Sequence, residues 1–311
     1  MPPPTGMPRG KSPGEPTDAT EDATEFEAHR AYLTAVAYRM LGNRAEAEDA
    51  VQEAWLRYAQ QTEEIRDPRG WLTTVTARIC LDQLNSARVR RAAYPGQWLP
   101  AYFVDPDAGP AELAELADQV SVALLVVLER LTPEQRVAFV LHDAFAVPFD
   151  EVATVLDTTP AAARQHASRG RRAVADGGIK HTAGLAEQRR ALDAFLAAAQ
   201  SGDVVALAAV LAPEVVAISD GGGLVRTAIN VVGGADKVAR FYAGLLGHKL
   251  AGITDIKVEP VLVNGGAAML LRGSRPDGHP LLAVLTVAVD QGRITGLFNQ
   301  QNPEKLLLGD L

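Results

Sequence analysis

The sequence is poor in several kinds of residue, and each shortage excludes a class of protein. Its 311 residues include one cysteine, Cys80, so no internal disulfide can form and a small disulfide-stapled scaffold is excluded. Aromatic residues make up only 5% of the chain, so Ala, Val and Leu must supply most of any core. No segment approaches the roughly 20 apolar residues that a membrane-spanning helix needs. We therefore interpret Cys80 as a buried structural thiol and expect a cytoplasmic protein with no membrane partner.

Basic residues are also fewer than acidic ones. The chain has 30 Lys and Arg against 38 Asp and Glu, which leaves a formal net charge of −8. Taken over the whole chain, this balance argues against nucleic acid as a partner. The arginines are concentrated, however, in residues 88–91 and 164–172. Because phosphate groups respond to local rather than net charge, these two stretches keep nucleic acid open as a partner.

The first 24 residues lack an apolar stretch and are rich in Pro, Gly, Thr and acidic residues. A secretion signal needs an apolar stretch, so this segment does not read as one. Its composition cannot bury enough apolar surface to fold, so residues 1–24 are predicted to form a disordered leader.

Residues 25–92 are predicted to form a first helical module. Apolar residues recur at the spacing of a core-facing helix over 26–41, and Gly42 then ends the helix. Asn43 is a typical N-cap for a second helix. A third helix begins near Trp71 and ends in a basic run.

A linker is predicted over residues 93–117, because prolines and glycines recur through it. It contains the apolar patch 98–103, which a purely solvated tether would not need.

Residues 118–178 are predicted to form a second helical module. Thr132 can cap a helix, with Gln135 closing a capping box. Two short helices, 149–156 and 160–175, follow and are separated by three turn residues. Two helices joined by so brief a turn are typical of the helix-turn-helix.

After a short linker at 179–186, the pattern changes. Residues 187–300 begin with two helical segments and continue as β-like runs divided by glycine turns. A tail follows at 301–311. The order predicts a fused α+β domain, with helices followed by a curved antiparallel sheet.

The second helix of the helix-turn-helix carries long polar side chains on an alanine-rich scaffold. Small apolar residues let the helix lie close to its partner, and the long side chains then project outward, as insertion into a major groove requires. A solvated basic helix in an all-α bundle is the plainer alternative. The side chains predicted to contact DNA are Arg164, Gln165, His166, Arg169, Arg171 and Arg172.

Several ordered motifs resemble one family. Residues 49–56, Asp-Ala-Val-Gln-Glu-Ala-Trp-Leu, resemble the region 2 signature of the extracytoplasmic-function (ECF) sigma factors, and residues 68–72, Pro-Arg-Gly-Trp-Leu, resemble a later step of that region. Residues 131–136, Leu-Thr-Pro-Glu-Gln-Arg, and the helix-turn-helix resemble region 4. The resemblance covers about residues 25–175. It implies two all-α modules that bind core RNA polymerase and direct it to promoters.

The resemblance also implies roles for individual residues. An acidic helix face would meet the basic β′ subunit of core polymerase, with the β subunit also a partner. The region 4 helix would read the −35 promoter element through the side chains named above. Trp71 would contact an unstacked −10 base, or it would pack in the core. The polymerase-binding residues would be Asp49, Gln52, Glu53 and Leu56, and the −10 residues Trp71, Arg78, Arg88, Arg90 and Arg91.

The C-terminal part resembles a SnoaL-like (NTF2-like) cone domain, as carried by the SigJ-like group of ECF factors. Three motifs of that group are present, one in the linker, one after the first strand of the extra domain and one near the C-terminus. They are Trp98-Leu99-Pro100, Asp220-Gly221-Gly222-Gly223 and Asn302-Pro303-Glu304-Lys305-Leu306.

Two interpretations of the fused domain remain. In the first, the linker patch and the tail dock on the domain and regulate the factor in cis, with compact docking lowering activity. In the second, the domain is an enzyme, since related folds use a buried Asp/His pair. Asp220 beside glycines could also be only a turn residue. We predict no enzyme, cofactor or metal site, and leave a small ligand in the cone open. A one-component ligand-sensing DNA-binding regulator, or a SnoaL-type small-molecule enzyme fused to a helix-turn-helix, is the alternative for the whole chain.

Overall fold

The computed structural model describes residues 16–63, 65–105, 121–176, 179–245, 252–276 and 278–308. The chain divides into two compact units. A helical unit combines Met1–Ser86 with Thr132–Gly170, and a sheet unit combines Ala87–Leu131 with Arg171–Leu311.

The helical unit begins with α1 (Pro16–Leu41), α2 (Arg44–Tyr58) and α3 (Pro68–Ala92), the last of which runs on past Ser86. Gly42 ends α1 with φ 72°, a left-handed conformation that glycine adopts without strain. The Asn43 side-chain oxygen caps α2 by accepting the backbone N–H groups of Ala45 and Glu46. The three helices predicted for this module are therefore present, and Cys80 is fully buried, as predicted for a structural thiol.

The predicted disordered leader is wrong for residues 16–24, because α1 already begins at Pro16. Proline is tolerated in the first turn of a helix, where its missing N–H has no partner to lose. The helix is anchored further on: Phe26 is buried, and the Tyr58 hydroxyl donates to Glu25 at 3.0 Å. Residues 1–15 of the predicted leader lie outside the described residues.

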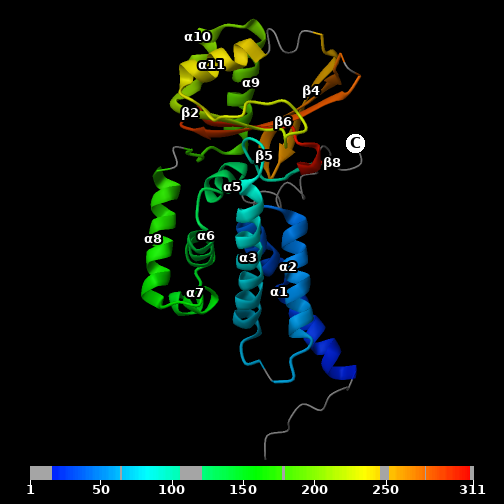
Figure 1. The fold of residues 1–311 in the computed structure, drawn as a ribbon, viewed down its shortest axis with the longest axis vertical. Helices are drawn as coiled ribbons and strands as arrows, with labels where there is room; N and C mark the ends of the chain where they lie inside the picture. Colours follow the sequence, from blue (N-terminus) through cyan, green and yellow to red (C-terminus); the bar gives the residue numbers. More distant parts are fainter. Residues whose placement is uncertain are drawn as a thin grey trace, which may run out of the picture. The chain divides into compact units, whose positions relative to one another are not determined.

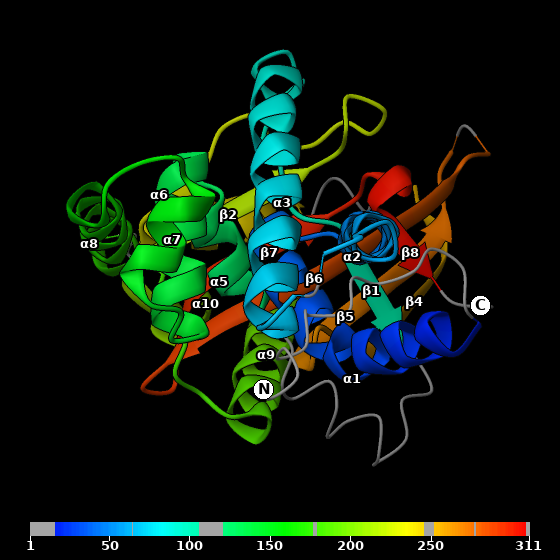
Figure 2. The same ribbon diagram turned by 90° about the horizontal axis from the view of Figure 1, so that it is seen from below.

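The second helical module consists of α6 (Pro133–Phe139), a π-helical turn η1 (Val140–Ala144), α7 (Phe149–Val155) and α8 (Pro160–Asp176). Thr132 and Gln135 form the predicted capping box of α6. The Thr159 hydroxyl accepts the N–H of Ala162 at the start of α8, as predicted. These helices lie together in Figure 2, with α7 and α8 forming the helix-turn-helix.

The sheet unit holds β1 (Tyr102–Asp105), β2 (Leu211–Asp220), β3 (Val232–Gly233), β4 (Thr254–Val263), β5 (Gly266–Ser274), β6 (Pro280–Asp290), β7 (Arg293–Gln300) and β8 (Leu306–Leu308). They form one sheet in the order β3-β2-β7-β6-β5-β4-β1-β8. The pairs β2–β7 and β1–β8 are parallel, and the others are antiparallel. The expectation of an antiparallel sheet therefore needs correction. Long connections separate the strands of each parallel pair, which lets the chain return in the same direction.

Both faces of the sheet are covered. Helices α9 (Leu185–Ser201), α10 (Val204–Val210) and α11 (Ala235–Gly244) lie over one face (Figure 1). Ala217 and Leu297 are buried against them. The short helix α5 (Val122–Leu128) packs on the other face, against Ile218 and Phe298. Because side chains alternate along a strand, consecutive residues such as Ala217 and Ile218 enter different cores.

Segments on either side of the fused domain also contribute strands to the sheet. The linker supplies β1, and the tail supplies β8 after a 3-10 turn, η3 (Pro303–Lys305). Strand β1 and helix α5 thus belong to the sheet unit, whereas the sequence assigned them to the linker 93–117 and the helical module 118–178. Residues 106–117 of the predicted linker lie outside the described residues.

Gly170 of α8 is buried and lies against α6. A Cβ atom at this position would lie 3.1 Å from the Gln135 carbonyl oxygen and 3.1 Å from the Phe139 Cβ. The backbone of α6 leaves no room for a larger residue.

We therefore expect Gly170→Leu to lower the free energy of unfolding of the helical unit by about 1–3 kcal/mol, through overpacking. Ala161→Leu is the control, because Ala161 is exposed on the same helix. Denaturant unfolding of the full chain, followed by circular dichroism, measures both. Equal stability of the two variants would mean that the α6–α8 contact tolerates a side chain.

Candidate functional site

One face of α2 is exposed and acidic. Asp49, Gln52, Glu53 and Leu56 are all exposed, and the Leu56 side chain is 51% exposed. The opposite face of the helix supplies buried core residues. Glu53 forms an ion pair with Arg57 one turn later. This face can therefore offer carboxylates and one apolar side chain to a basic partner.

Helix α8 turns Ala163 and Ala167 inward and its guanidinium groups outward. Ala163, Ala167 and Gly170 are buried, so the helix lies close to its neighbours. The outward side chains that were predicted to contact DNA are exposed: Arg164, Gln165, Arg169, Arg171 and Arg172. His166 is only half-buried, and its buried Nδ1 has no hydrogen-bond partner among the described residues. The arrangement leaves a basic surface that can meet a groove or a phosphate backbone.

The residues predicted for the −10 element lie in different surroundings along α3. Trp71 is half-buried, with its ring centroid 5.8 Å from that of Tyr58. Arg88 is exposed, whereas the side chains of Arg90 and Arg91 lie outside the described residues. The Arg78 guanidinium donates to the carbonyl oxygen of Thr154, on α7, at 2.7 Å.

The two helical modules thus contact each other within the helical unit. Phe145, which follows η1, packs edge-to-face on Tyr32 of α1 with centroids 5.4 Å apart. The Arg39 guanidinium lies 4.9 Å from the Phe145 ring centroid, and the Arg69 guanidinium lies 4.2 Å from that of Tyr32. Aromatic and cation–π contacts therefore join α1 to the second module, and the Arg69 contact joins the start of α3 to α1.

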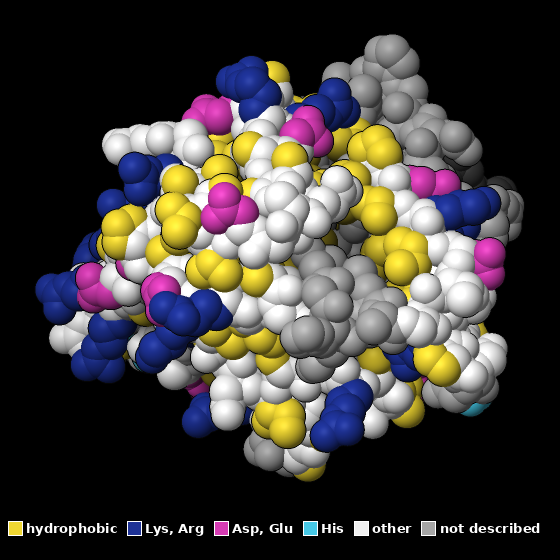
Figure 3. All heavy atoms as spheres, turned by 90° about the horizontal axis from the view of Figure 1, so that it is seen from above, with side chains coloured by type: hydrophobic (Ala, Val, Ile, Leu, Met, Phe, Trp, Pro, Cys, Tyr) yellow, Lys and Arg dark blue, Asp and Glu magenta, His cyan; other side chains and the backbone are white. Residues whose placement is uncertain are grey.

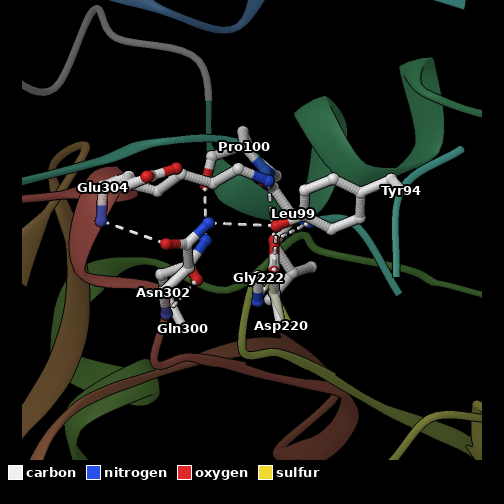
Figure 4. Close-up of polar contacts among 9 residues, drawn as sticks. Tyr94, Leu99, Pro100, Asp220, Gly222, Gln300, Asn302 and Glu304 are labelled. Carbon is white, nitrogen blue, oxygen red and sulfur yellow. Dashed lines mark hydrogen bonds and ion pairs between the residues drawn. The ribbon is translucent and has the colours of Figure 1, made fainter. Parts of the chain in front are cut away.

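The sheet unit contains a buried carboxylate. Asp220, at the end of β2, has 0% of its side chain exposed. Its Oδ1 accepts the Tyr94 hydroxyl at 2.6 Å and the Gly222 N–H at 2.9 Å. Its Oδ2 accepts the Leu99 N–H at 2.8 Å and the Lys305 ammonium at 2.7 Å. We call Tyr94, Leu99, Asp220, Asn302 and Lys305 the Asp220 cluster (Figure 4).

Lys305 ties the tail to the linker as well as to the carboxylate. Its Nζ donates to the Leu99 carbonyl oxygen at 3.0 Å. The same Nζ lies 4.1 Å from the Trp98 ring centroid and 4.4 Å from the Tyr94 ring centroid. The side chain is only 14% exposed, so these contacts form where water competes weakly.

Amide groups extend the Asp220 cluster along the tail. The Asn302 Nδ2 donates to the Tyr94 hydroxyl at 3.0 Å, and its Oδ1 accepts the Glu304 N–H at 3.0 Å. Gln300 Nε2 donates to the Pro100 carbonyl oxygen at 3.1 Å, while Gln300 Oε1 accepts the Asn302 N–H. Burial is the largest cause that raises the pKa of Tyr94, and the Asp220 carboxylate raises it further, so the hydroxyl keeps its proton.

At each of the three positions after Asp220, a different steric constraint explains why the residue is glycine. A Cβ atom at Gly221 would lie 2.1 Å from the Val225 carbonyl oxygen. Gly222 has φ 64°, and a Cβ atom there would lie 2.5 Å from Asn302 Nδ2. Gly223 has φ 74°, and a Cβ atom there would lie 2.6 Å from Pro95 Cγ. The motif therefore provides the turn and the close approach of both the tail and the linker.

All three motifs shared with the SigJ-like group contribute to this region, though not through every residue. Leu99 and Leu306 are buried, whereas the Pro303 and Glu304 side chains are exposed. Sequence reasoning missed Tyr94 and Gln300. The only available signal for Tyr94 was an aromatic residue in a segment rich in proline and glycine. Gln300 had none, because a glutamine at a strand end is normally solvated.

A cavity of about 930 Å³ lies on the helix-covered face of the sheet. Among the residues that the structure describes, those that line it include no Asp, Glu or His. Over the described part of the chain, no group of three His, Cys, Asp or Glu residues could hold a metal ion. In that part, too, the helices are all too short or too polar to span a membrane.

Comparison with known proteins identifies similar chains. Residues 26–90 match the family model for sigma-70 region 2, and residues 121–174 match that for sigma-70 region 4. The ECF RNA polymerase sigma factor SigJ of Mycobacterium tuberculosis H37Rv is 43% identical over 293 residues, 91% of this chain and 93% of that protein. The probable ECF RNA polymerase sigma factor SigI of M. tuberculosis CDC 1551 is 37% identical over 287 residues, 90% of this chain and 93% of its own. The crystal structure of M. tuberculosis SigJ matches with a TM-score of 0.67 and 38% identity, over 91% of this chain and 97% of that chain.

The Asp220–Lys305 pair generates a stability prediction. Asp220→Asn keeps the side-chain shape but removes the charge and leaves Lys305 buried without its counterion. We expect a loss of about 3–5 kcal/mol in the free energy of unfolding of the sheet unit. Lys305→Met should cost less when Asp220 is already Asn than when it is not. Denaturant unfolding gives the energies, and hydrogen exchange at the Leu99 amide reports the linker contact.

Asp236→Asn is the matched control. Asp236 pairs with Arg240 on α11, but the two side chains are 68% and 71% exposed, so the change should cost far less than Asp220→Asn. If Asp220→Asn costs no more than this control, the buried pair does not hold the linker.

Proposed function

Since the chain belongs to the ECF family of RNA polymerase sigma factors, we propose that its C-terminal sheet unit regulates promoter recognition in cis, by holding the linker between regions 2 and 4. The observation that carries this proposal is the Asp220 carboxylate, which accepts hydrogen bonds from both the linker and the tail.

Core polymerase binding is assigned to the exposed face of α2. Asp49, Gln52 and Glu53 offer acidic and polar groups, and the exposed Leu56 offers an apolar anchor beside them. Carboxylates that meet a basic surface steer association and fix its register, and an apolar anchor adds affinity. The partner surface proposed is a basic helical element of the polymerase β′ subunit, with the β subunit contacting other parts of the factor.

Promoter recognition is assigned to α3 and α8. Arg164, Gln165 and Arg169 have the length and donors to read base edges of the −35 element, while Arg171 and Arg172 suit phosphates. Trp71 is half-buried on Tyr58, which leaves part of its ring available to an unstacked −10 base.

The contact between the two helical modules supports an inactive arrangement. Arg78 cannot donate to the Thr154 carbonyl oxygen and hold the DNA backbone with the same N–H group. Regions 2 and 4 must also separate to reach promoter elements that lie apart on the duplex. The contact between Phe145 and Tyr32 must therefore break before the two regions can separate, so this contact stabilises the compact state.

A linker held by the Asp220 cluster would favour that compact state. Residues 94–100 are tied to the sheet unit, which shortens the free chain between regions 2 and 4. A bias of a few kcal/mol is enough to move such an equilibrium from mostly open to mostly closed. The sheet unit thus acts as an inhibitory element that a signal must release.

Charge reversal on α2 tests the polymerase surface. We expect Asp49→Arg with Glu53→Arg to weaken binding to core polymerase by about tenfold or more, because like charges would face each other. Asp193→Arg on α9 is the control, since Asp193 is exposed far along the chain from α2. Fluorescence anisotropy measures the affinity for purified core polymerase of the unaltered chain, the double variant and the control. Unchanged affinity in the double variant would place the polymerase contact elsewhere.

Release of the linker tests the regulation. We expect Tyr94→Phe and Lys305→Met to raise promoter-specific transcription in vitro about fivefold, because each weakens the cluster while leaving α2, α3 and α8 intact. Lys237→Met, at an exposed lysine of α11, should leave transcription unchanged. Folded variants with unchanged or lower activity would contradict the inhibitory role, while promoter-specific transcription by the unaltered chain would still support the sigma function.

A further inference from the structure

The cavity on the helix-covered face has the size and lining of a small-molecule site. Its volume of about 930 Å³ lies within the range of drug-sized ligand pockets. Phe195 and Leu196 of α9, Phe241 of α11 and Met269 of β5 contribute to an apolar wall.

The cavity reaches the surface along β4. Ile256 and Val258 line it and are also 41% and 42% exposed, which is unusual for large hydrophobic side chains. Hydrophobic side chains also gather in patches on the face drawn in Figure 3, with Lys and Arg mostly toward its margin. A largely apolar molecule would thus meet apolar surface on its way in.

Two guanidinium groups make the lining favour a negatively charged ligand. Arg226 follows the three glycines, and Arg275 lies in the turn between β5 and β6. Neither forms an ion pair with any described residue, and the described residues of the lining include no carboxylate that would offset them. An unopposed guanidinium beside an apolar wall selects a ligand with an apolar body and an acidic group.

Tyr242 adds an unsatisfied donor to the same wall. It is 3% exposed, and its hydroxyl has no hydrogen-bond partner among the described residues. Burial raises the pKa of Tyr242, so the hydroxyl remains a donor. A ligand that brings an acceptor oxygen to this wall would satisfy a group that is costly to leave unpaired.

The cavity and the Asp220 cluster lie on opposite faces of the same two strands. Ser219 and Asn299, paired across β2 and β7, line the cavity. The next pair, Asp220 with Gln300, faces the linker and is fully buried. Gln301 then lines the cavity again, while its N–H donates to the Asp220 carbonyl oxygen at 2.8 Å. A shift of either strand caused by a ligand must therefore move the cluster.

We propose that this cavity binds an apolar small-molecule acid and that its occupancy changes the hold of the Asp220 cluster on the linker. The coupling rests on the regulatory function proposed above, whereas the binding does not. The sheet unit then converts the concentration of a small acid into the availability of the promoter-binding regions.

A matched pair of fluorescent probes tests the binding with the full chain. Pyrenebutyrate carries the acid, and pyrenebutanol has the same body without the charge. We expect pyrenebutyrate to bind with a Kd about tenfold lower than pyrenebutanol. Arg226→Gln with Arg275→Gln should abolish that preference, whereas Arg189→Gln, at an exposed arginine outside the lining, should keep it. Ala228→Trp, which fills the cavity from the half-buried loop after the glycines, should weaken both probes.

The same probe tests the coupling. Saturating pyrenebutyrate should change hydrogen exchange at the Leu99 amide about fivefold, and Tyr94→Phe should change the pyrenebutyrate Kd correspondingly, because coupling is reciprocal. If neither probe binds, or if the wild-type chain binds pyrenebutyrate and pyrenebutanol with equal affinity, the cavity is not a site for an acid. Binding without any effect on Leu99 exchange overturns the coupling. Both measurements omit polymerase, so they stand or fall independently of the transcription results.

Discussion

The buried carboxylate of Asp220 is the constraint on which the sheet unit depends. A charge with 0% exposure is stable in a protein interior only if donors replace the lost water. Here four donors do so, and two of them, the Leu99 N–H and the Lys305 ammonium, come from segments more than 200 residues apart. The linker and the tail must meet at the end of β2 for the carboxylate to be satisfied, so one charge holds three segments together.

The two-faced sheet makes that constraint relevant to function. Odd-numbered residues at the ends of β2 and β7 line the cavity, and even-numbered neighbours face the linker, because side chains alternate along a strand. A polar cluster and an apolar cavity are thus one residue apart along the same backbone. The glycines after Asp220 complete this arrangement, since a side chain at Gly222 would strike the tail and one at Gly223 would strike the linker.

Sequence patterns predicted the local structure well, but they predicted only some of the contacts that individual side chains make. Caps such as Asn43 and Thr132 acted as predicted, because a cap is decided by residues within one turn. The exposed face of α2 and the outward arginines of α8 also followed from helical spacing. Arg78 was predicted to contact DNA but donates to a carbonyl oxygen of α7, a contact 76 residues away that no local pattern encodes. Tyr94 and Gln300 were missed for the same reason.

By itself, the sequence determined the helices, their caps, the alternating strands and the membership of the ECF family, because these depend on short-range spacing and ordered motifs. Only the tertiary structure decided that the linker contributes strand β1 and the tail strand β8 to one mixed sheet. It also decided that Asp220 is a buried counterion to Lys305 rather than a solvated turn residue. Burial and partnership of a charge depend on segments brought together from across the chain, and the spacing of residues along one segment carries no record of them.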